Sequence, residues 1–409
     1  MGHSAGAVDL HLSPTGHGIS IVMGPTTVTC VYGRGAYVSG QRLASELLIE
    51  GLRARGWRVR AIPTPVLDRS DETQARMWQT RLRMIWQLCW AWLRGIRAAF
   101  GSGPLYVNVG QTRIALVRDG LPVLIRSLLG SQGRIVLSRH GSFFVAWTRE
   151  AVEARLLRRM ARPAAFVTVL GEKQRQHLIG LGIPSHKVVV MDNTCLVTPL
   201  ADEECERKQA SHGTAIRVLF LSNLMESKGY PEFIEAIAIL AKKDQSFRAT
   251  LCGVVLDAER GDRFTTAQAA TEWIQRRCEE INASAAVRIE WVQGAFGREK
   301  DELFRHAHIF VLPSKTEGQP LVLLEALASG CAVIATNVGG IPETVDADTA
   351  ILLEHGGPEP LADAILRLVG EPERRAMLAR HGLLLFRSRF SYEQHLERWE
   401  GLLAKISGT

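Results

Sequence analysis

The chain has 409 residues, of which 46% are hydrophobic and 22% are charged. This balance excludes a fibrous or disordered protein, and the length is sufficient for two ordinary domains. The sequence contains no run of about 18 uncharged apolar residues and no pattern of a cleaved export signal, so we expect neither a membrane span nor secretion. The seven cysteines are odd in number and lack a C-x-x-C pair, which favours reduced thiols in the cytoplasm over disulfides or a zinc site.

Charge is divided unevenly along the chain. Residues 1–200 contain 25 lysines and arginines against 11 acidic residues, whereas residues 201–409 contain 24 against 31. The net charges of the two halves are therefore +14 and −7. A basic half predicts an anionic partner, such as a membrane surface, a pyrophosphate-bearing lipid or nucleic acid. Solvated surface arginine is the ordinary alternative.

The first half alternates short apolar runs with helical patterns. Residues 1–18 are rich in Gly, Ser and His without periodicity and predict a disordered segment. The expected strands cover residues 19–23, 59–62, 105–109, 134–138, 166–169 and 188–191. We expect Gly33, Gly35 and Gly40 to lie in a loop after the first strand, before a helix that stops at Gly56. Such an alternation is typical of a parallel α/β sheet.

The alternation breaks between residues 192 and 213, and a second one follows. Its expected strands cover residues 216–221, 249–254, 287–291, 309–312, 332–336 and 351–353, and its helices residues 231–241, 264–282, 299–306, 320–329 and 359–368. The last amphipathic helix is long enough to pack back on the first domain. We therefore predict an N-terminal domain over 19–196, a linker over 197–214, a C-terminal domain over 215–388 and a terminal helix over 389–409.

The segment around Lys228 has the pattern of an anion site. An apolar strand ends in a polar loop, and Lys228 lies just before a helix that Pro231 opens. Proline at the first helical position leaves neighbouring N–H groups free, and the helix dipole at that end favours an anion. Lys228 would add a positive charge beside a phosphate. An ordinary exposed lysine is the alternative.

Residues 313–330 carry a stronger pattern. A buried strand leads into a glycine-containing turn, and a short helix runs from Pro320 to a terminating Gly330. Glu317 falls at the end of the strand, where ligands bind in open α/β sheets. Glu325 lies on a mostly apolar helix and needs a partner, since burying an unpaired charge is costly. Hydroxyls of a bound sugar would serve, whereas a capping role for Glu317 and a buried ion pair for Glu325 are the structural alternatives.

Glu317 and Glu325 form a Glu-x7-Glu motif, and here the sequence resembles family 4 of the glycosyltransferases, which are retaining enzymes with the GT-B fold. The matching segments from Ile19 to Ile406 are the loop through Gly40, His140-Gly141, Asn193, Lys228-Gly229, Pro313-Ser314, residues 317–330 and residues 338–343. The resemblance implies an α/β fold of two Rossmann-like domains whose parallel sheets face each other across a cleft. It implies a nucleotide-sugar co-substrate, no other cofactor and no obligatory metal.

The resemblance also assigns roles to individual residues. Lys228 would hold the donor diphosphate, Glu317 the hydroxyls of the transferred sugar and Glu325 those of the ribose. His140 would reach the donor sugar from the first domain, and with Lys228 and Glu317 it completes the catalytic set. The other donor-binding residues would be Gly40, Asn223, Gly318, Gln319, Pro320, Leu321 and Val322, with amides of the helix start completing the cradle.

One position departs from the family pattern. The family usually has arginine where this chain has Asn223, five residues before Lys228. Asparagine donates a hydrogen bond but brings no charge, so the missing cation is supplied elsewhere or the donor affinity falls. Arg34 and Arg139 are candidates to replace it.

Residues 77–100 combine tryptophan with arginine. The segment contains Trp78, Trp86, Trp90 and Trp92 together with Arg81, Arg83, Arg94 and Arg97, and Arg76 precedes it. This chemistry is typical of a helix in a membrane interface, and with the basic first half it predicts peripheral membrane contact and a lipid-linked acceptor. A core-packing helix with a basic outer face is the alternative.

The sequence thus predicts an enzyme that moves a sugar from a UDP- or GDP-linked donor, GDP-mannose among them, to a saccharide or lipid-linked saccharide in polysaccharide or glycolipid synthesis. It would work in the cytoplasm, at the inner face of the membrane. The alternatives are a GT-B-type sugar-nucleotide epimerase or hydrolase and a non-catalytic nucleotide-sugar-binding subunit. Nucleic-acid binding is disfavoured because the sequence contains no recognition module.

Overall fold

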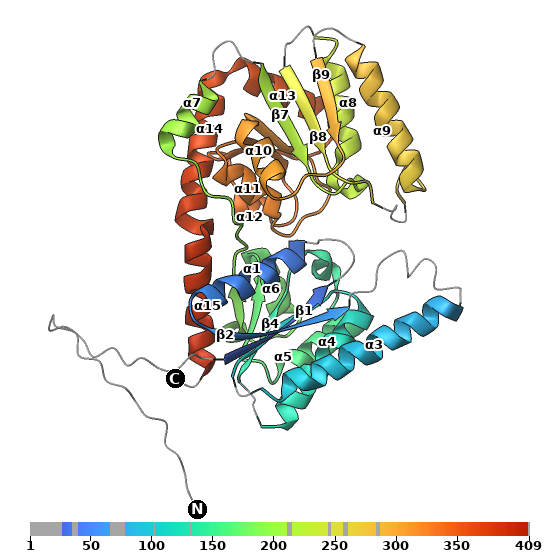
Figure 1. The fold of residues 1–409 in the computed structure, drawn as a ribbon, viewed down its shortest axis with the longest axis vertical. Helices are drawn as coiled ribbons and strands as arrows, with labels where there is room; N and C mark the ends of the chain where they lie inside the picture. The colour runs from blue at the N-terminus through green and yellow to red at the C-terminus, as the bar shows by residue number, and fades with distance from the viewer. Residues whose placement is uncertain are drawn as a thin grey trace, which may run out of the picture.

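The computed structural model describes residues 27–34, 40–65, 78–101, 103–130, 133–210, 215–243, 247–256, 261–283 and 287–407. These residues form two lobes, each built on a six-stranded sheet in which every pair of neighbouring strands is parallel (Figure 1). Helices cover both faces of each sheet, so the architecture is α/β throughout.

The first lobe has the strand order β2-β1-β3-β4-β5-β6. Its strands are β1 (Thr27–Arg34), β2 (Arg58–Pro65), β3 (Leu105–Asn108), β4 (Ile135–Ser138), β5 (Phe166–Val169) and β6 (Val188–Val190). Its helices are α1 (Gly40–Ala54), α3 (Trp78–Ala99), α4 (Arg113–Leu128), α5 (Val152–Ala161) and α6 (Glu172–Gly180). The short 3-10 helices η1 (Phe143–Ala146) and η2 (Ser185–Lys187) complete the lobe.

The beginning of this lobe differs from the expectation. The expected strand at 19–23 and the disordered segment over 1–18 lie outside the described residues. The first described strand is β1, and Gly33 lies within it rather than in a loop. The sequence of β1, TVTCVYGR, is rich in β-branched residues, which favour an extended, buried strand and outweigh a single glycine.

The second lobe has the strand order β12-β11-β10-β7-β8-β9. Its strands are β7 (Ile216–Leu221), β8 (Phe247–Cys252), β9 (Val287–Val292), β10 (Ile309–Leu312), β11 (Ala332–Thr336) and β12 (Ala350–Leu353). Its helices are α8 (Tyr230–Leu240), α9 (Ala267–Asn282), α10 (Arg298–His306), α11 (Leu321–Ala328), α12 (Ile341–Thr344), α13 (Pro358–Gly370) and α14 (Pro372–Leu385), with the 3-10 helix η3 (Glu226–Lys228) before α8. Helix α8 begins one residue before Pro231, which therefore lies inside its first turn.

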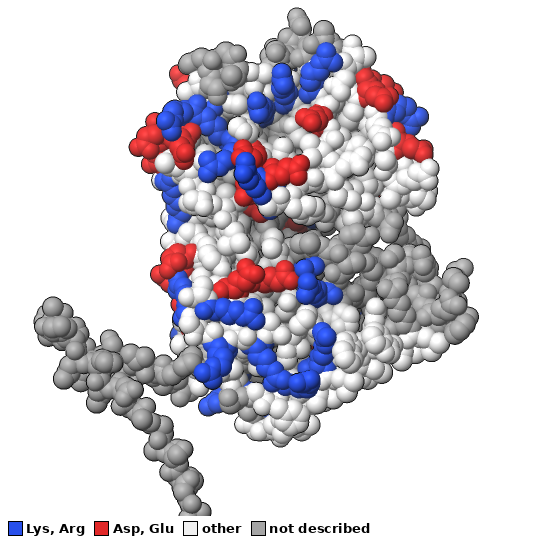
Figure 2. Space-filling view, viewed as in Figure 1, with Lys and Arg blue, Asp and Glu red and all other residues white. Residues whose placement is uncertain are grey.

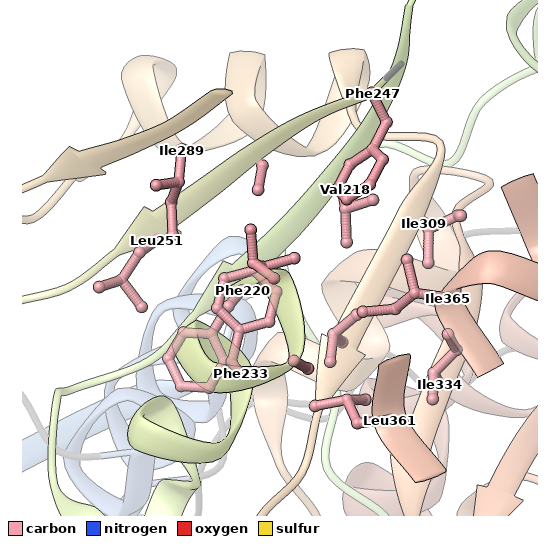
Figure 3. Packing of buried hydrophobic residues seen from close by; sticks show 14 of the residues in the cluster. Val218, Phe220, Phe233, Phe247, Leu251, Ile289, Ile309, Ile334, Leu361 and Ile365 are labelled. Carbon is pink, nitrogen blue, oxygen red and sulfur yellow. The ribbon is translucent and has the colours of Figure 1, made fainter. Parts of the chain in front are cut away.

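The main core of the second lobe fills the space between its sheet and helices α8, α9 and α13. Figure 3 shows Val218 and Phe220 from β7 meeting Phe233 of α8 and Ile365 of α13. Alternate residues of the same strand face the other side, where Leu219 joins a second cluster with α10 and α11. Strands β10 and β11 are buried throughout and read as short apolar runs, whereas β9 (VRIEWV) alternates buried and exposed residues.

The connection between the lobes carries two further helices. Helix α7 (Asp202–Gln209) lies within the expected linker, and Cys205 on this helix belongs to the core of the second lobe. The chain returns through α14, the π-helical turn η4 (Phe386–Phe390) and α15 (Tyr392–Ser407), which run in succession along one side of both lobes (Figure 1). Trp399 and Leu396 of α15 pack into the core of the first lobe, beside α1.

None of the helices in the described part of the chain is both long and apolar enough to cross a membrane.

Candidate functional site

Two loops meet where the strand order of the second sheet reverses. Strands β7 and β10 are neighbours, and their crossovers run in opposite directions. In an open parallel sheet this is the point at which a crevice forms outside the carboxyl ends of the strands. The loop after β7 carries Lys228, and the loop after β10 carries Glu317. The topology therefore brings together two residues that lie 89 positions apart in the sequence.

Lys228 and Glu317 contact each other directly. The Lys228 ammonium donates a hydrogen bond to Glu317 Oε1 at 2.8 Å, and the Ser314 hydroxyl donates to the same oxygen at 3.0 Å. Glu317 is buried, with 8% of its surface exposed, whereas Lys228 is partly open to solvent. The ion pair keeps both charges in place at the crevice, and a bound anion would compete for the ammonium.

Glycines allow the surrounding loops to approach closely. Gly229 has a φ of +78°, and a Cβ atom there would lie 2.2 Å from the carbonyl oxygen of Pro313. Gly339 has a φ of +56°, and its Cβ atom would lie 1.9 Å from the carbonyl oxygen of Glu317. Both positions thus require glycine for conformation and for space. The loop over residues 338–343 packs directly beneath Glu317.

A cavity of about 490 Å³ lies between the two lobes at this crevice. Its lining includes every site residue that the sequence predicts: Gly40, His140, Asn223, Lys228, Glu317, Gly318, Gln319, Pro320, Leu321, Val322 and Glu325. The first lobe contributes the start of α1 and the end of β4, and the second lobe contributes the loops after β7, β8 and β10. The cavity is of the size and the cleft position that ligand sites commonly have.

Glu325 forms the buried ion pair that the sequence offered as an alternative, with a partner that the sequence did not identify. Lys300 of α10 donates a hydrogen bond to Glu325 Oε1 at 2.6 Å, and both residues line the cavity. Glu325 Oε2 is buried and has no hydrogen-bond partner among the described residues. Burial raises the pKa of the Glu325 carboxyl, and the Lys300 ammonium opposes that rise. The pair thus leaves the second carboxylate oxygen of Glu325 without a hydrogen bond among the described residues.

The candidates for the missing cation are not at the cavity. Asn223 lines it, but neither Arg34 nor Arg139 does. Arg139 is fully buried, its guanidinium lies over the Phe144 ring at 4.5 Å, and it donates to a backbone carbonyl in the first lobe. The expectation for these two arginines is therefore wrong, since the cations among the described residues of the lining are Lys228 and Lys300. A lysine in a charged helix gives no sequence signal of this contact.

His140 reaches the cavity as a neutral side chain. Burial lowers its pKa to about 4, so the imidazole carries no charge at neutral pH. Its Nε2 lies 3.1 Å from the Ser138 hydroxyl, and the Asn193 side chain also interacts with the ring. A neutral ring can take part in a hydrogen bond but cannot neutralise a phosphate.

Gln319 joins the two lobes through its side chain. Its Oε1 accepts a hydrogen bond from the backbone N–H of Asn193 at 2.6 Å, and its Nε2 donates a hydrogen bond to Asp192 Oδ1 at 2.9 Å. Asp192 also accepts from Arg389 at 2.9 Å and from Arg398 at 3.1 Å. The sequence reasoning used only the backbone amide of Gln319, so this bridging role of the side chain is new.

A second contact between the lobes involves the loop beneath Glu317. The Glu343 carboxylate accepts hydrogen bonds from the backbone amides of Glu172 and Lys173, at the start of α6. An acid at this end of a helix satisfies free N–H groups and the helix dipole.

In the described ranges, no three His, Cys, Asp or Glu side chains gather in a way that could hold a metal ion.

Comparison of the sequence with known proteins points to one family for the second lobe. Residues 202–383 match the model of the family described as glycosyl transferases group 1. The D-inositol 3-phosphate glycosyltransferase of Corynebacterium aurimucosum is 30% identical over 200 residues, which are 47% of this chain and 45% of that protein. The chain thus spans less than half the length of the curated relatives that it matches.

Comparison of the coordinates covers nearly the whole chain. Anabaena Alr3699/HepE in complex with UDP aligns with a TM-score of 0.66 and 17% identity, over 93% of this chain and all of that one. Sucrose-phosphate synthase from Thermosynechococcus elongatus aligns with a TM-score of 0.65 and 18% identity, over 93% and 99%. At these identities the likeness concerns the fold alone. The predicted fold, GT-B with two Rossmann-like domains, is confirmed.

Proposed function

We propose that the chain is a retaining glycosyltransferase of the family 4 type, which moves a sugar from a nucleotide-diphosphate sugar to a saccharide acceptor. The observation that carries this proposal is the single cavity that joins Lys228, Glu317, Glu325 and His140 between two lobes. The match of residues 202–383 to the glycosyl transferases group 1 supports it. UDP is the favoured nucleotide, because Anabaena Alr3699/HepE is similar in fold and has been crystallised with UDP and with UDP-glucose.

The cavity fits the chemistry of glycosyl transfer. As the bond between the anomeric carbon and the phosphate oxygen breaks, its electron pair and negative charge pass to the leaving diphosphate, and the Lys228 ammonium would stabilise that charge. The acceptor hydroxyl would attack the anomeric carbon from the same face and give its proton to a leaving phosphate oxygen. The product then retains the anomeric configuration, and no carboxylate needs to act as nucleophile. Glu317 and neutral His140 would hold hydroxyls of the transferred sugar.

Lys300 would compensate in part for the missing arginine. In this role it adds a positive charge to the cavity and holds Glu325 ionised, so that the carboxylate can accept hydrogen bonds from the ribose. Asn223 would then contribute a hydrogen bond without charge.

A Lys300→Met variant tests this role through the pH dependence of UDP binding. Without the ammonium the pKa of Glu325 rises further, so the carboxyl takes up its proton at a higher pH. Because ribose binding needs the ionised form, UDP affinity of the variant should fall about tenfold between about pH 8 and about pH 5.5, whereas the parent chain should change less. Isothermal titration calorimetry measures this difference. Arg298→Met, an exposed change on the same helix, is the control, and parallel pH profiles would refute the role.

The acceptor in this proposal is a saccharide carried by a lipid, used at the inner face of the membrane. The support is the helix α3, which combines exposed tryptophans with arginines, and the basic first half of the chain. Free saccharides remain useful as test acceptors because transfer chemistry itself needs only a hydroxyl.

The proposed activity is tested by mixing the purified chain with UDP- and GDP-sugars, with and without saccharide and lipid-linked acceptors. We expect UDP release that depends on acceptor, and a glycosylated product whose anomeric configuration matches that of the donor. Mass spectrometry and NMR identify the product. Release of free sugar or formation of an epimer without acceptor would instead indicate a hydrolase or an epimerase. Tight UDP binding without turnover under all conditions would indicate a non-catalytic subunit.

A further inference from the structure

A second cavity lies on the first lobe and shares no lining residue with the donor cavity. Its volume is about 480 Å³, and helices α3, α4 and α5 form its walls. The lining is mostly apolar and includes Trp92, Leu121, Leu124, Leu156 and Met160. An apolar cavity of this size open to the surface indicates a ligand with a hydrocarbon part.

Exposed apolar side chains also occur on α3 and α4, the helices that contribute Trp92 and Leu124 to the cavity. Leu82, Trp86, Trp90 and Leu93 of α3 have between 43% and 65% of their surfaces exposed, and Leu128 of α4 has 78%. The Trp86 and Trp90 rings stack with their centroids 6.0 Å apart. Helix α3 lies along the outside of the first lobe, on the far side from the second lobe (Figure 1). These residues form what we call the apolar face of α3 and α4.

The surroundings of the cavity are basic. Helix α3 contains no aspartate or glutamate. The one acid of α4, Asp119, is buried against Arg118, and the one acid of α5, Glu153, pairs with Arg113.

Two arginines belong to the cavity itself. Arg159 and Arg162 are exposed residues of its lining, and neither forms a salt bridge within the described ranges. Figure 2 shows that basic side chains also occur on one face of the first lobe. The side chains at the rim therefore suit an anion.

A glycine provides space in the wall of the cavity. Gly120 of α4 lines it, and a Cβ atom there would find its nearest neighbour, the Met160 sulfur, at 3.5 Å. This is an ordinary contact distance, so a side chain at position 120 can be added without displacing backbone. A large apolar side chain there would occupy part of the cavity while leaving the exposed face as apolar as before.

We propose that this cavity binds the hydrocarbon chain of an anionic lipid, with its phosphate beside Arg159 and Arg162 and the apolar face of α3 and α4 in the bilayer interface. A second copy of this chain is a poorer occupant, because two such faces would bring arginines against arginines. The inference rests on the membrane contact of the proposed function and deepens it by naming the site and the lipid charge. It does not depend on which sugar is transferred.

The test is binding of palmitoyl lysophosphatidylglycerol, below its micelle concentration, to the full chain and to two variants. Palmitoyl lysophosphatidylcholine has the same hydrocarbon chain without net charge and serves as the reference. We expect tighter binding of the anionic lipid, about fivefold for each of the two arginines and about thirtyfold for both. Gly120→Leu should weaken both lipids about tenfold, because it occupies the space of several methylene groups. The double change of Arg159→Gln and Arg162→Gln should remove only the preference for the anionic lipid.

Controls separate this site from the donor cavity and from non-specific binding. Met377→Gln changes an exposed apolar residue of α14 in the other lobe and should leave lipid binding unchanged. UDP affinity and transfer to a soluble acceptor should be unchanged in all these variants, so that failure of the lipid site and failure of the proposed function are distinguishable. Unaltered lipid binding by Gly120→Leu would overturn the proposal. The proposal would also be overturned if the chain formed a dimer through the apolar face of α3 and α4 in sedimentation velocity and bound neither lipid.

Discussion

Replacement of Lys228 by methionine is expected to lower the rate of sugar transfer by about a thousandfold, which is the scale seen when one group that stabilises a developing charge is removed. The ammonium lies at the cavity, where Asn223 supplies no charge. The Lys300 ammonium of α10 is hydrogen-bonded to Glu325 and therefore cannot replace Lys228 beside the leaving diphosphate. Methionine keeps the length and the apolar stem of lysine, so the loss should concern charge. Single-turnover kinetics with saturating donor measures the rate of the chemical step.

The single variant also leaves a buried carboxylate without its ammonium, so stability must be followed together with activity. Glu317 keeps the Ser314 hydroxyl as a donor but loses the ion pair, which lowers Tm. A Lys228→Met and Glu317→Gln double variant removes the uncompensated charge and should recover Tm without recovering activity. Lys315→Met is the matched control, because Lys315 is an exposed neighbour that pairs with Glu232 and does not line the cavity. Near-normal rates in Lys228→Met would remove the basis of the proposed function.

A Gly339→Ala variant should lose donor binding and stability together. Its φ of +56° is unfavourable for alanine, and the added Cβ atom would collide with the carbonyl oxygen of Glu317. The loop and the backbone of Glu317 must move apart to relieve this collision. The shift of the Glu317 backbone displaces its carboxylate from Lys228. We expect a loss of roughly 3 kcal/mol or more in the free energy of unfolding and a UDP affinity that is at least about tenfold weaker. Urea denaturation and calorimetry measure the two effects.

The matched control for this variant is Gly56→Ala. Gly56 has a φ of +86°, but a Cβ atom there has no neighbour within 4 Å. The change therefore measures the conformational cost alone, about 1 kcal/mol, with UDP affinity unchanged. If Gly339→Ala behaved like Gly56→Ala, the close packing of this loop beneath Glu317 would have no energetic importance.

The strands of both sheets could be predicted from sequence wherever buried apolar runs are bounded by turns. The runs at 216–221, 309–312 and 332–336 match β7, β10 and β11 residue for residue. Where the predicted elements differ from the observed ones, a local feature of the sequence obscured the pattern of apolar residues. Gly33 looked like a loop residue although the β-branched residues before it form β1. Helix α7 was hidden because its eight residues are mostly charged and bury only Cys205 and Gln209.

Some features of the site could be predicted from a continuous stretch of sequence, whereas others arise only when distant segments meet in the fold. The strand, glycine turn and helix start around Glu317 are contiguous, so their placement at a cleft followed from sequence and resemblance. The partners in the ion pairs did not follow, because each pair joins segments that are far apart in the sequence. Lys300 lies 25 residues before Glu325, and nothing in that spacing distinguishes it from a solvated lysine. The bridging side chain of Gln319 was missed for the same reason, as its partners belong to the other lobe.

The chain passes between the lobes twice, and both passages meet at Asp192. The outgoing segment contains Asp192. The returning segment contains Arg389, which forms a salt bridge with the Asp192 carboxylate. The Thr194 hydroxyl, in the outgoing segment, donates a hydrogen bond to the carbonyl oxygen of Phe390, in the returning segment. The two connecting segments are therefore bonded to each other at this point. The Glu343 carboxylate ties the lobes at a second place, so a change in the angle between the lobes would break its hydrogen bonds to the start of α6. Opening would then widen the cavity and separate His140 from the loop that bears Glu317.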